Sequence, residues 1–475
     1  MKVIRNYLYN AGYQILAVIV PLITSAYVSR VLRPEGSGAN AYTNSIIQYF
    51  ILLASIGIGY YGNREIAYVR DNLKKMSQTF WEIQIVKTVM TIVAYIAFLI
   101  FMYFYTGNPI YMWAQSINLV ATAFDISWLY QGIEDFKRTV IRNTLVKIIS
   151  TIAIFVFIRD AGDVTLYISL LAVSTFIGNL TLWPHIPFIL ERVKVSELNP
   201  WRHFRPTVAM FVPQIATQLY VQLNRTMLGI MISETAAGFY QYSDSLVKLV
   251  LAFVTATGTV MLPHVSNAFS KGDMDKVNSM LYKSFDFVSA LAFPMTFGLA
   301  AVATTLGPYY FGPGYGPVGP AMMIESIVIL MIGWSNVIGT QYLLPINKVK
   351  EFTISVTIGA VVNIIMNIPL IYLGGLNGAM WSTVISEVAV TTYQLWVVRK
   401  VLDFKELFKG TIKYLIAGIV IFAPIYWVNI TVTTTWPRLI LEVISGILIY
   451  VLMIFILKPP VLASAKEIIA KQRKK

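Results

Sequence analysis

Apolar runs of about 20 residues follow one another along the whole chain, and each is long enough to cross a bilayer as one helix. Inside the hydrocarbon, a backbone has to satisfy its own hydrogen bonds, and a continuous apolar run does this as a helix. The composition agrees, because 57% of the 475 residues are hydrophobic and only 13% are charged. A soluble protein of this size needs more polar surface. The sequence therefore predicts an all-α polytopic membrane protein.

We expect about fourteen transmembrane helices. They cover roughly 8–30, 40–62, 79–104, 109–131, 142–158, 164–189, 206–232, 238–264, 284–306, 319–342, 352–373, 376–398, 411–429 and 438–457. The second, eighth and ninth spans contain polar residues and glycines, which indicates that they line something other than lipid.

The basic residues predict the orientation of these spans. With a cytoplasmic N-terminus, about 30 of the 37 Lys and Arg residues fall in or next to cytoplasmic segments, as the positive-inside rule requires. We therefore expect both termini in the cytoplasm, with the basic tail 458–475 against anionic lipid headgroups. The net charge of +14 then needs no nucleic-acid partner.

The residue inventory excludes several kinds of chemistry. The chain has no cysteine and only three scattered histidines, so we expect neither thiolate chemistry nor a histidine metal site. It also has no Gly-x-x-x-x-Gly-Lys-Ser/Thr phosphate loop and no recognisable catalytic dyad. We expect a protein that is not an enzyme and that needs no cofactor.

A weak internal repeat divides the chain. The segment "VPLIT" at 20–24 aligns with "VPQIA" at 212–216, and at this offset Arg33 falls on Arg225. After an eight-residue difference, "GANAYTNS" at 38–45 aligns with "GFYQYSDS" at 238–245. A repeat of six spans keeps its orientation, which predicts two bundles related by a pseudo-two-fold axis along the membrane normal. The expected parts are a six-helix lobe at 1–200, a second at 201–402, two further helices at 403–457, and the tail at 458–475.

Four segments resemble one family in order and spacing. They are "SRVLRPEGSGANAYTNS" at 29–45, "DISWLYQGIEDFKRTVIRN" at 125–143, the stretch from "VPQIATQLYVQLNRTMLG" to "GFYQYSDSLVK" at 212–248, and "VVNIIMNIPLIYLGGLNGAMWST" at 361–383. Together they resemble the polysaccharide transporter, or O-antigen-flippase-like, branch of the multidrug/oligosaccharidyl-lipid/polysaccharide exporter superfamily. The resemblance covers essentially the whole chain. One departure is Asn224, where the family often carries an acidic residue.

The resemblance implies a flippase of the bacterial inner membrane. Its implied cargo is an oligosaccharide repeat unit on undecaprenyl diphosphate, which two lobes move from the inner to the outer leaflet by alternating access, without ATP hydrolysis. The product would be a capsule, an exopolysaccharide or an O-antigen-like polymer. Implied partners are membrane lipids and, further, a polysaccharide polymerase and export machinery.

Arg225 is the leading candidate for binding such a cargo. Gln214, Gln218, Gln222 and Arg225 are spaced by four, four and three residues, so they share one helical face. A polar stripe on an apolar helix avoids lipid, and a cation at its end can attract a diphosphate or an acidic sugar. An interhelical ion pair, or a charge that reaches the outer interface, explains Arg225 equally.

Four further residues belong to the predicted cavity or gate. Asp244 and Lys248 are four residues apart in one helix, which favours an ion pair that is either self-contained or opened by an anionic cargo. Arg33 is an exit-gate cation or a solvated interfacial arginine. Lys87 either captures phosphate near the cytoplasm or extends to the interface.

Acidic residues in the spans are candidates for ion coupling. Glu387, Asp125 and Glu325 stand in or near apolar segments, where burial favours the protonated carboxyl. Proton or sodium linkage at any of them is an expectation, and solvation at the interface is the alternative for Asp125.

Two other functions compete with the lipid-linked oligosaccharide flippase. A lipid II flippase or a small-molecule exporter of the same superfamily is the first, although an exporter of cationic drugs is expected to carry an acidic cavity. A membrane glycosyltransferase or polymerase is the second. It would call for large outer loops, whereas the predicted outer loops are short.

Overall fold

The computed structural model describes residues 2–463, and within them it describes the side chains outside 2–18, 210, 212–217, 219–220, 257 and 259–260. The described chain divides into two compact units, Met1–Ile230 and Met231–Lys475. The contacts of residues 204–230 group them with the first unit. The sequence predicts a boundary between two six-helix lobes at residue 200. That boundary concerns which helices move together during transport, and it remains a prediction.

Helices make up both units. The first unit holds α1 (Lys2–Ser55), α2 (Ile58–Val69), α3 (Leu73–Phe104), α4 (Pro109–Phe124), α5 (Ser127–Gly132), α6 (Phe136–Phe157), α7 (Val164–Leu180) and α8 (Phe204–Met231), with the short helices η1 (Ala161–Asp163), η2 (Trp183–Phe188), η3 (Val195–Glu197) and η4 (Pro200–His203). The second unit holds α9 (Glu234–Ser270), α10 (Met274–Phe311), α11 (Val318–Glu325), α12 (Ile327–Ser335), the π-helix η5 (Asn336–Leu343), α13 (Val349–Val398), α14 (Phe404–Leu407), α15 (Thr411–Thr431) and α16 (Trp436–Leu457).

The structure confirms the predicted all-α polytopic membrane fold. Within residues 2–463, ten helical segments are long and apolar enough to cross a membrane, and no strand is assigned. Two of the ten, Ile19–Val69 and Val349–Val398, are about 50 residues long and hold two predicted spans each. The predicted spans at 109–131 and 206–232 correspond to α4 with α5 and to α8.

Both long helices turn back at a residue with positive φ. In α1 this residue is Arg33, with φ 60° and ψ 175°, directly before Pro34. In α13 it is Gly375, with φ 55° and ψ −127°. The kink at Arg33 lies in the segment 29–45, where the sequence predicts a turn between two helices.

Two helices of the first unit are broken within the length of a span. Between α1 and α2, Ile56 and Gly57 take positive φ values of 41° and 78°. Between α4 and α5, Asp125 is extended and Ile126 is non-helical. Non-helical backbone at membrane depth is tolerated where it is covered by protein or lines a wet cavity. The residues around these breaks therefore become candidates for a site.

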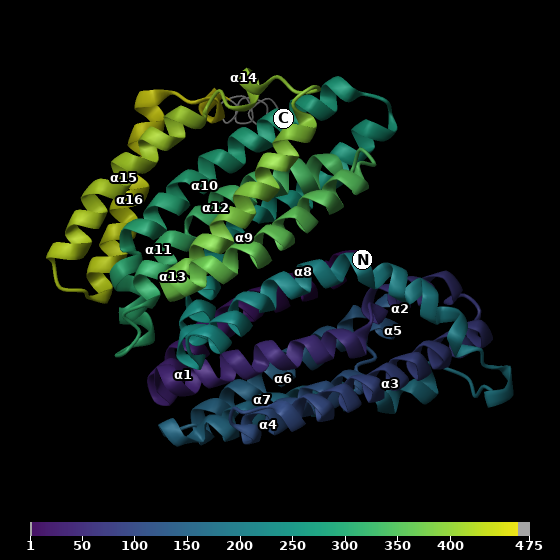
Figure 1. Ribbon diagram of the computed structural model, residues 1–475. Helices are drawn as coiled ribbons and strands as arrows, with labels where there is room; N and C mark the ends of the chain where they lie inside the picture. The colour runs from purple at the N-terminus through teal and green to yellow at the C-terminus, as the bar shows by residue number, and fades with distance from the viewer. Residues whose placement is uncertain (1, 464–475) are drawn as a thin grey trace. The chain divides into compact units, whose positions relative to one another are not determined.

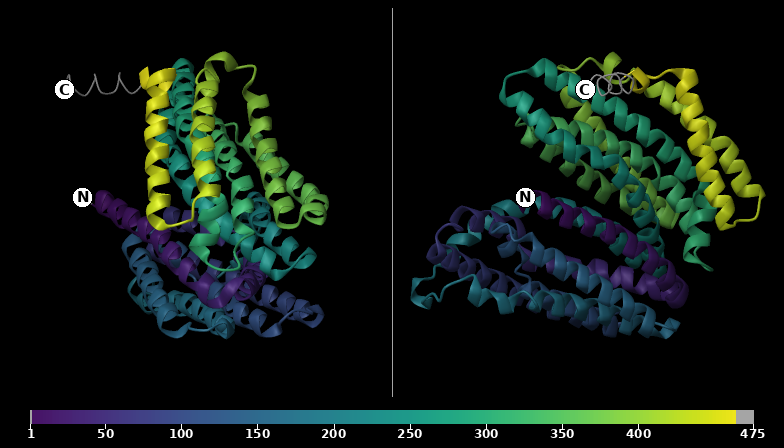
Figure 2. Two further views of the ribbon diagram at one scale, coloured as in Figure 1. Left: turned by 90° about the vertical axis from the view of Figure 1, so that its left-hand side faces the viewer. Right: turned by 180° about the vertical axis from the view of Figure 1, so that it is seen from behind.

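The core of the first unit forms where α1, α3, α4, α6 and α7 run side by side (Figure 1). In the second unit, α15 and α16 lie along α10 (Figures 1 and 2). A polar network crosses that contact: Thr304 Oγ1 donates to Asn429 Oδ1 at 3.0 Å, and Glu442 accepts from Asn429 and, at 2.7 Å, from Arg438 Nε. The two C-terminal helices are thus joined to α10 through buried polar side chains as well as apolar contact.

Candidate functional site

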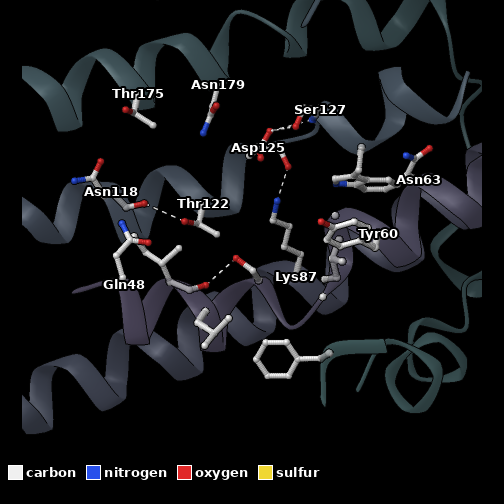
Figure 3. A pocket seen from close by; sticks show the side chains of 18 of the residues that line it. Gln48, Tyr60, Asn63, Lys87, Asn118, Thr122, Asp125, Ser127, Thr175 and Asn179 are labelled. Atoms are coloured by element: carbon white, nitrogen blue, oxygen red, sulfur yellow. Dashed lines mark hydrogen bonds between the residues drawn. The ribbon is translucent and has the colours of Figure 1, made fainter. Parts of the chain in front are cut away.

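A polar cavity of about 730 Å³ lies inside the first unit, at the two helix breaks. Its volume falls in the range of roughly 300–1,000 Å³ that is typical of ligand pockets. Residues from both breaks line it, together with side chains from α1, α3, α4 and α7 (Figure 3). The polar lining residues are Asn44, Gln48, Ser55, Tyr60, Asn63, Lys87, Asn118, Thr122, Asp125, Ser127, Gln131, Thr175 and Asn179.

One buried glutamine orients the amides at one end of this cavity. The side-chain oxygen of Gln115 accepts from Asn44 Nδ2 at 3.4 Å and from Asn118 Nδ2 at 3.1 Å. Gln115 Nε2 in turn donates to Asn40 Oδ1 at 3.2 Å. Asn44 and Asn118 each spend one of their two amide N–H groups on Gln115 and keep a second N–H and a carbonyl oxygen. The amide network therefore offers both hydrogen-bond donors and acceptors at the cavity.

Lys87 and Asp125 are the charged residues of the lining. Lys87 is buried, and its Nζ donates to the backbone oxygen of Asp125 at 2.5 Å, a carbonyl released by the break after α4 (Figure 3). The Asp125 carboxylate accepts from the backbone N and the Oγ of Ser127 at 3.0 and 2.6 Å. An ammonium has three N–H donors, so Lys87 holds the broken helix and keeps donors for the cavity.

Trp128 lines the cavity next to these charges. Its ring is 2% exposed and stacks on Phe80 with centroids 5.3 Å apart. The ring also lies against Gly62, where an added Cβ would come within 2.6 Å of it. Its Nε1 is buried and has no hydrogen-bond partner among the described residues. A buried indole N–H normally finds an acceptor, so the missing partner makes Trp128 an unusual residue of the lining.

The predicted glutamine face of α8 lies outside this cavity. Gln222 is buried, Gln218 is exposed, and the side chain of Gln214 lies outside the described residues. Arg225 is half-buried and interacts electrostatically with Tyr49 of α1, whose hydroxyl lies 3.0 Å from Thr226 Oγ1. The structure therefore places Arg225 against α1, apart from Lys87 and Asp125.

In the second unit the structure brings three predicted residues together. Lys248 Nζ lies 2.7 Å from Asp244 Oδ2, and the two side chains are 50% and 17% exposed. The carboxyl of Glu325, which is 1% exposed, shares a hydrogen bond with Asp244. The predicted pair is present but is not self-contained. The cluster therefore brings two carboxyl groups and one ammonium into contact.

The remaining predicted residues, Arg33 and Glu387, lie elsewhere. Arg33 is exposed at the kink of α1, and Glu387 is half-buried in α13. Neither joins the cavity or the Asp244–Lys248–Glu325 cluster.

In the first unit, a buried polar cluster lies where α3 contacts η4. His203 Nδ1 lies 2.7 Å from the Tyr61 hydroxyl, and its Nε2 lies 2.8 Å from Glu82 Oε2. Arg202 also binds Glu82, at 2.6 Å. Burial lowers the pKa of His203, against the opposing effect of Glu82. This cluster fastens the segment before α8 to α3.

Sequence reasoning missed most of the cavity lining. It selected Lys87 and Asp125 singly, because charges in apolar spans are conspicuous, but not Asn118, Thr122 or Asn179. The available signal was spacing: Asn118, Thr122 and Asp125 are four and three residues apart and so share a face of α4. The break between α4 and α5, which brings Ser127 and Trp128 to the same cavity, left no clear mark in the sequence.

Comparison with known proteins identifies the family to which this chain belongs. Residues 3–269, more than half of the chain, match the model of the family described as polysaccharide biosynthesis protein. A candidate O-antigen transporter of Escherichia coli (strain K12) is 23% identical over 401 residues, which cover 83% of this chain and 96% of that protein. Among solved structures, the inward closed conformation of the lipid II flippase MurJ superposes with a TM-score of 0.73 at 14% identity, covering 94% of this chain and 98% of that one. An inward-facing multidrug resistance MATE family transporter of the MOP superfamily gives 0.62 at 14% identity, covering 83% and 96%.

Proposed function

Because this chain belongs to the polysaccharide biosynthesis protein family, we propose that it is a flippase for lipid-linked oligosaccharides. Its cargo is a repeat unit on undecaprenyl diphosphate, moved from the inner to the outer leaflet for export of a capsule, an exopolysaccharide or an O-antigen-like polymer. The name of the Escherichia coli relative, a candidate O-antigen transporter that the chain matches over most of both lengths, supports this cargo class.

The observation that carries the proposal is the polar cavity at the two broken helices. A sugar head has to cross about 30 Å of hydrocarbon, which requires a wet, hydrogen-bonding path. Irregular backbone between half-helices is how transporters build binding sites at membrane depth. The amides, hydroxyls and single ammonium of the cavity suit a polyhydroxylated head, while the lipid tail stays in the bilayer.

The rest of the assignment follows from topology. We place the protein in the bacterial cytoplasmic membrane with both termini in the cytoplasm, in line with the distribution of basic residues. Two six-helix lobes, 1–200 and 201–402, alternate access to the cargo. Membrane lipids surround the protein, and a polysaccharide polymerase with its export machinery receives the product.

Arg225, with the glutamine face of α8, attracts the anionic diphosphate in this scheme. Arg33 serves as a cation at the outer end of the path.

The Asp244–Lys248–Glu325 cluster couples transport to an ion. Lys248 supplies one positive charge against two carboxyl groups, so an anionic group that competes for the lysine favours protonation of the carboxyl pair. This gives Glu325 a defined role among the three predicted coupling residues. Glu387 and Asp125 are the alternatives.

The experiment that tests the function is leaflet-resolved transport. The purified chain is reconstituted in vesicles with lipid-linked oligosaccharides, and a membrane-impermeant reagent reports the sugars on the outer face over time, with and without imposed proton or sodium gradients. Transport above empty vesicles supports a flippase. Equal rates with and without the protein contradict it, and transport of lipid II or of a cationic dye alone would reassign the cargo.

A further inference from the structure

We propose that the cavity of the first unit binds an uncharged sugar, through its hydroxyl or acetamido groups, and holds neither the diphosphate nor an acidic sugar. This inference rests on the proposed function and deepens it, since it assigns one chemical part of the cargo to one site.

The charge of the lining is the first reason. Lys87 and Asp125 are its only charged residues within the described chain, and they sit side by side with the ammonium on the aspartate's own carbonyl. Their charges cancel at the cavity wall. A diphosphate or a carboxylate bound there would meet a lysine whose charge Asp125 already balances, whereas anion sites in proteins use unpaired arginines, lysines or helix N-termini. The wall is therefore electrically neutral.

The amides of the lining are the second reason. Asn44 and Asn118 each spend one N–H on Gln115, so each keeps a second N–H and a carbonyl oxygen that can accept a hydrogen bond. Carbonyl oxygens repel anions, but they accept hydrogen bonds from hydroxyl and amide N–H groups. A neutral sugar carries many such donors, and a diphosphate at neutral pH carries none.

Unused donors of the lining complete the match. Lys87 is buried and has N–H groups beyond its one bond to Asp125. A sugar hydroxyl accepts as readily as it donates, so one ring can satisfy the asparagine oxygens and these donors together. The cavity volume of about 730 Å³ leaves room for more than one ring.

The absence of cysteine provides a direct test. A Thr122→Cys variant places the only thiol of the full chain in the cavity lining, and a Thr431→Cys variant places it at an exposed site in α15. Both are purified, held in lipid nanodiscs and treated with a thiol reagent. The labelling rate is measured with maltotriose, with chitotriose, with an oligogalacturonate and with inorganic pyrophosphate.

We expect maltotriose or chitotriose to slow labelling of the Thr122→Cys variant at least about threefold, and oligogalacturonate and pyrophosphate to leave it unchanged. No ligand should affect the Thr431→Cys variant. Adding Gln48→Leu or Asn118→Leu should weaken the protection, and an unchanged melting temperature shows that each variant is folded.

Three results would overturn the assignment: protection by pyrophosphate or oligogalacturonate equal to that by the neutral sugars, protection by none of the four, or protection that survives both added substitutions. Vesicle transport separates this outcome from the proposed function. Transport without protection supports the flippase function and contradicts sugar binding in this cavity. Protection without transport supports sugar binding in this cavity and contradicts the flippase function.

Discussion

Asn44 and Gln48 of the first unit occupy the positions that Asp244 and Lys248 occupy in the second, 200 residues later in the internal repeat. The amides of the first unit line a cavity, and Asn44 bonds to a neutral glutamine, Gln115. The acid and base of the second form an ion pair, and Asp244 bonds to a buried glutamate, Glu325. At matching places one unit presents neutral hydrogen-bonding groups and the other presents titratable charge.

This difference suggests a division of labour. Amides recognise hydroxyl groups without a change of charge, so they suit a site for the body of a sugar. A lysine with two carboxyl groups changes its net charge when it gains or loses a proton, so it suits a site that responds to an ion gradient or to an anion. Variants that exchange or remove these groups test whether the two roles are separate.

The largest effect is expected at Lys87. Replacing it in a Lys87→Met variant leaves the Asp125 carboxylate without its counter-charge and the broken helix without a hydrogen bond, a loss of about 3 kcal/mol for a buried pair. Both the melting temperature and vesicle transport should fall. Lys74→Met, on the same helix but exposed, is the control and should behave as the wild type. A stable, fully active Lys87→Met variant would contradict the role of the cavity in the first unit.

Arg225 should affect transport without affecting stability. Arg225 lies neither in the cavity of the first unit nor in the Asp244–Lys248–Glu325 cluster. We expect Arg225→Ala to abolish polysaccharide export and to leave the abundance of the protein in the membrane unchanged. Arg225→Lys should be partly active, because lysine keeps the charge but loses the planar fork that binds phosphate. Export in a deletion strain measures the effect, with the exposed Arg205→Ala on the same helix as control. Normal export by the alanine variant would remove Arg225 from the mechanism.

Glu325 should affect only the response to a gradient. A Glu325→Gln variant keeps a hydrogen bond to Asp244 but cannot release a proton, so the basal rate should persist while stimulation by an imposed pH gradient disappears. Vesicle transport with and without the gradient measures this, and the exposed Glu406→Gln is the control. Undiminished stimulation would move coupling away from the cluster and towards Glu387.

The smallest effect is expected at His203, away from both sites. Its pKa in the folded protein is lowered by burial, below the value of about 6.5 in the unfolded chain. The unfolded chain therefore binds more protons as the pH falls through 6.5, and the folded state loses stability there. The melting temperature should drop between pH 7.5 and 5.5, by less in a His203→Gln variant, and the slope stays below about 1.4 kcal/mol per pH unit, the limit for one proton. Parallel pH profiles for both proteins would show that His203 does not titrate in this range.

The sequence predicted the helices well and the site poorly, for physical reasons. Each span is about 20 apolar residues long, a local property that can be read without its neighbours. The cavity depends on two breaks, at Gly57 and Asp125, and on the hydrogen bonds that hold two of its asparagines to Gln115. These are tertiary effects, because an asparagine in an apolar helix looks the same whether it faces a partner helix or a cavity.

The prediction at Asp244 and Lys248 was closer, because a four-residue spacing fixes an ion pair within one helix. Its partner Glu325 belongs to α11, and only the folded chain shows that it joins them.

The hydrogen bonds of α15 and α16 to α10 indicate what would happen if these last two helices were removed. Tyr414 of α15 donates to Asp286 of α10 at 2.8 Å, Tyr450 of α16 donates to the backbone oxygen of Ala290, and Asn429 holds Thr304. A chain cut after the twelfth predicted span would turn an aspartate, a hydroxyl and a carbonyl of α10 towards hydrocarbon. A form of this protein with twelve transmembrane helices would thus need apolar substitutions on α10, because the last two helices supply the hydrogen-bond partners for the polar groups on one face of α10.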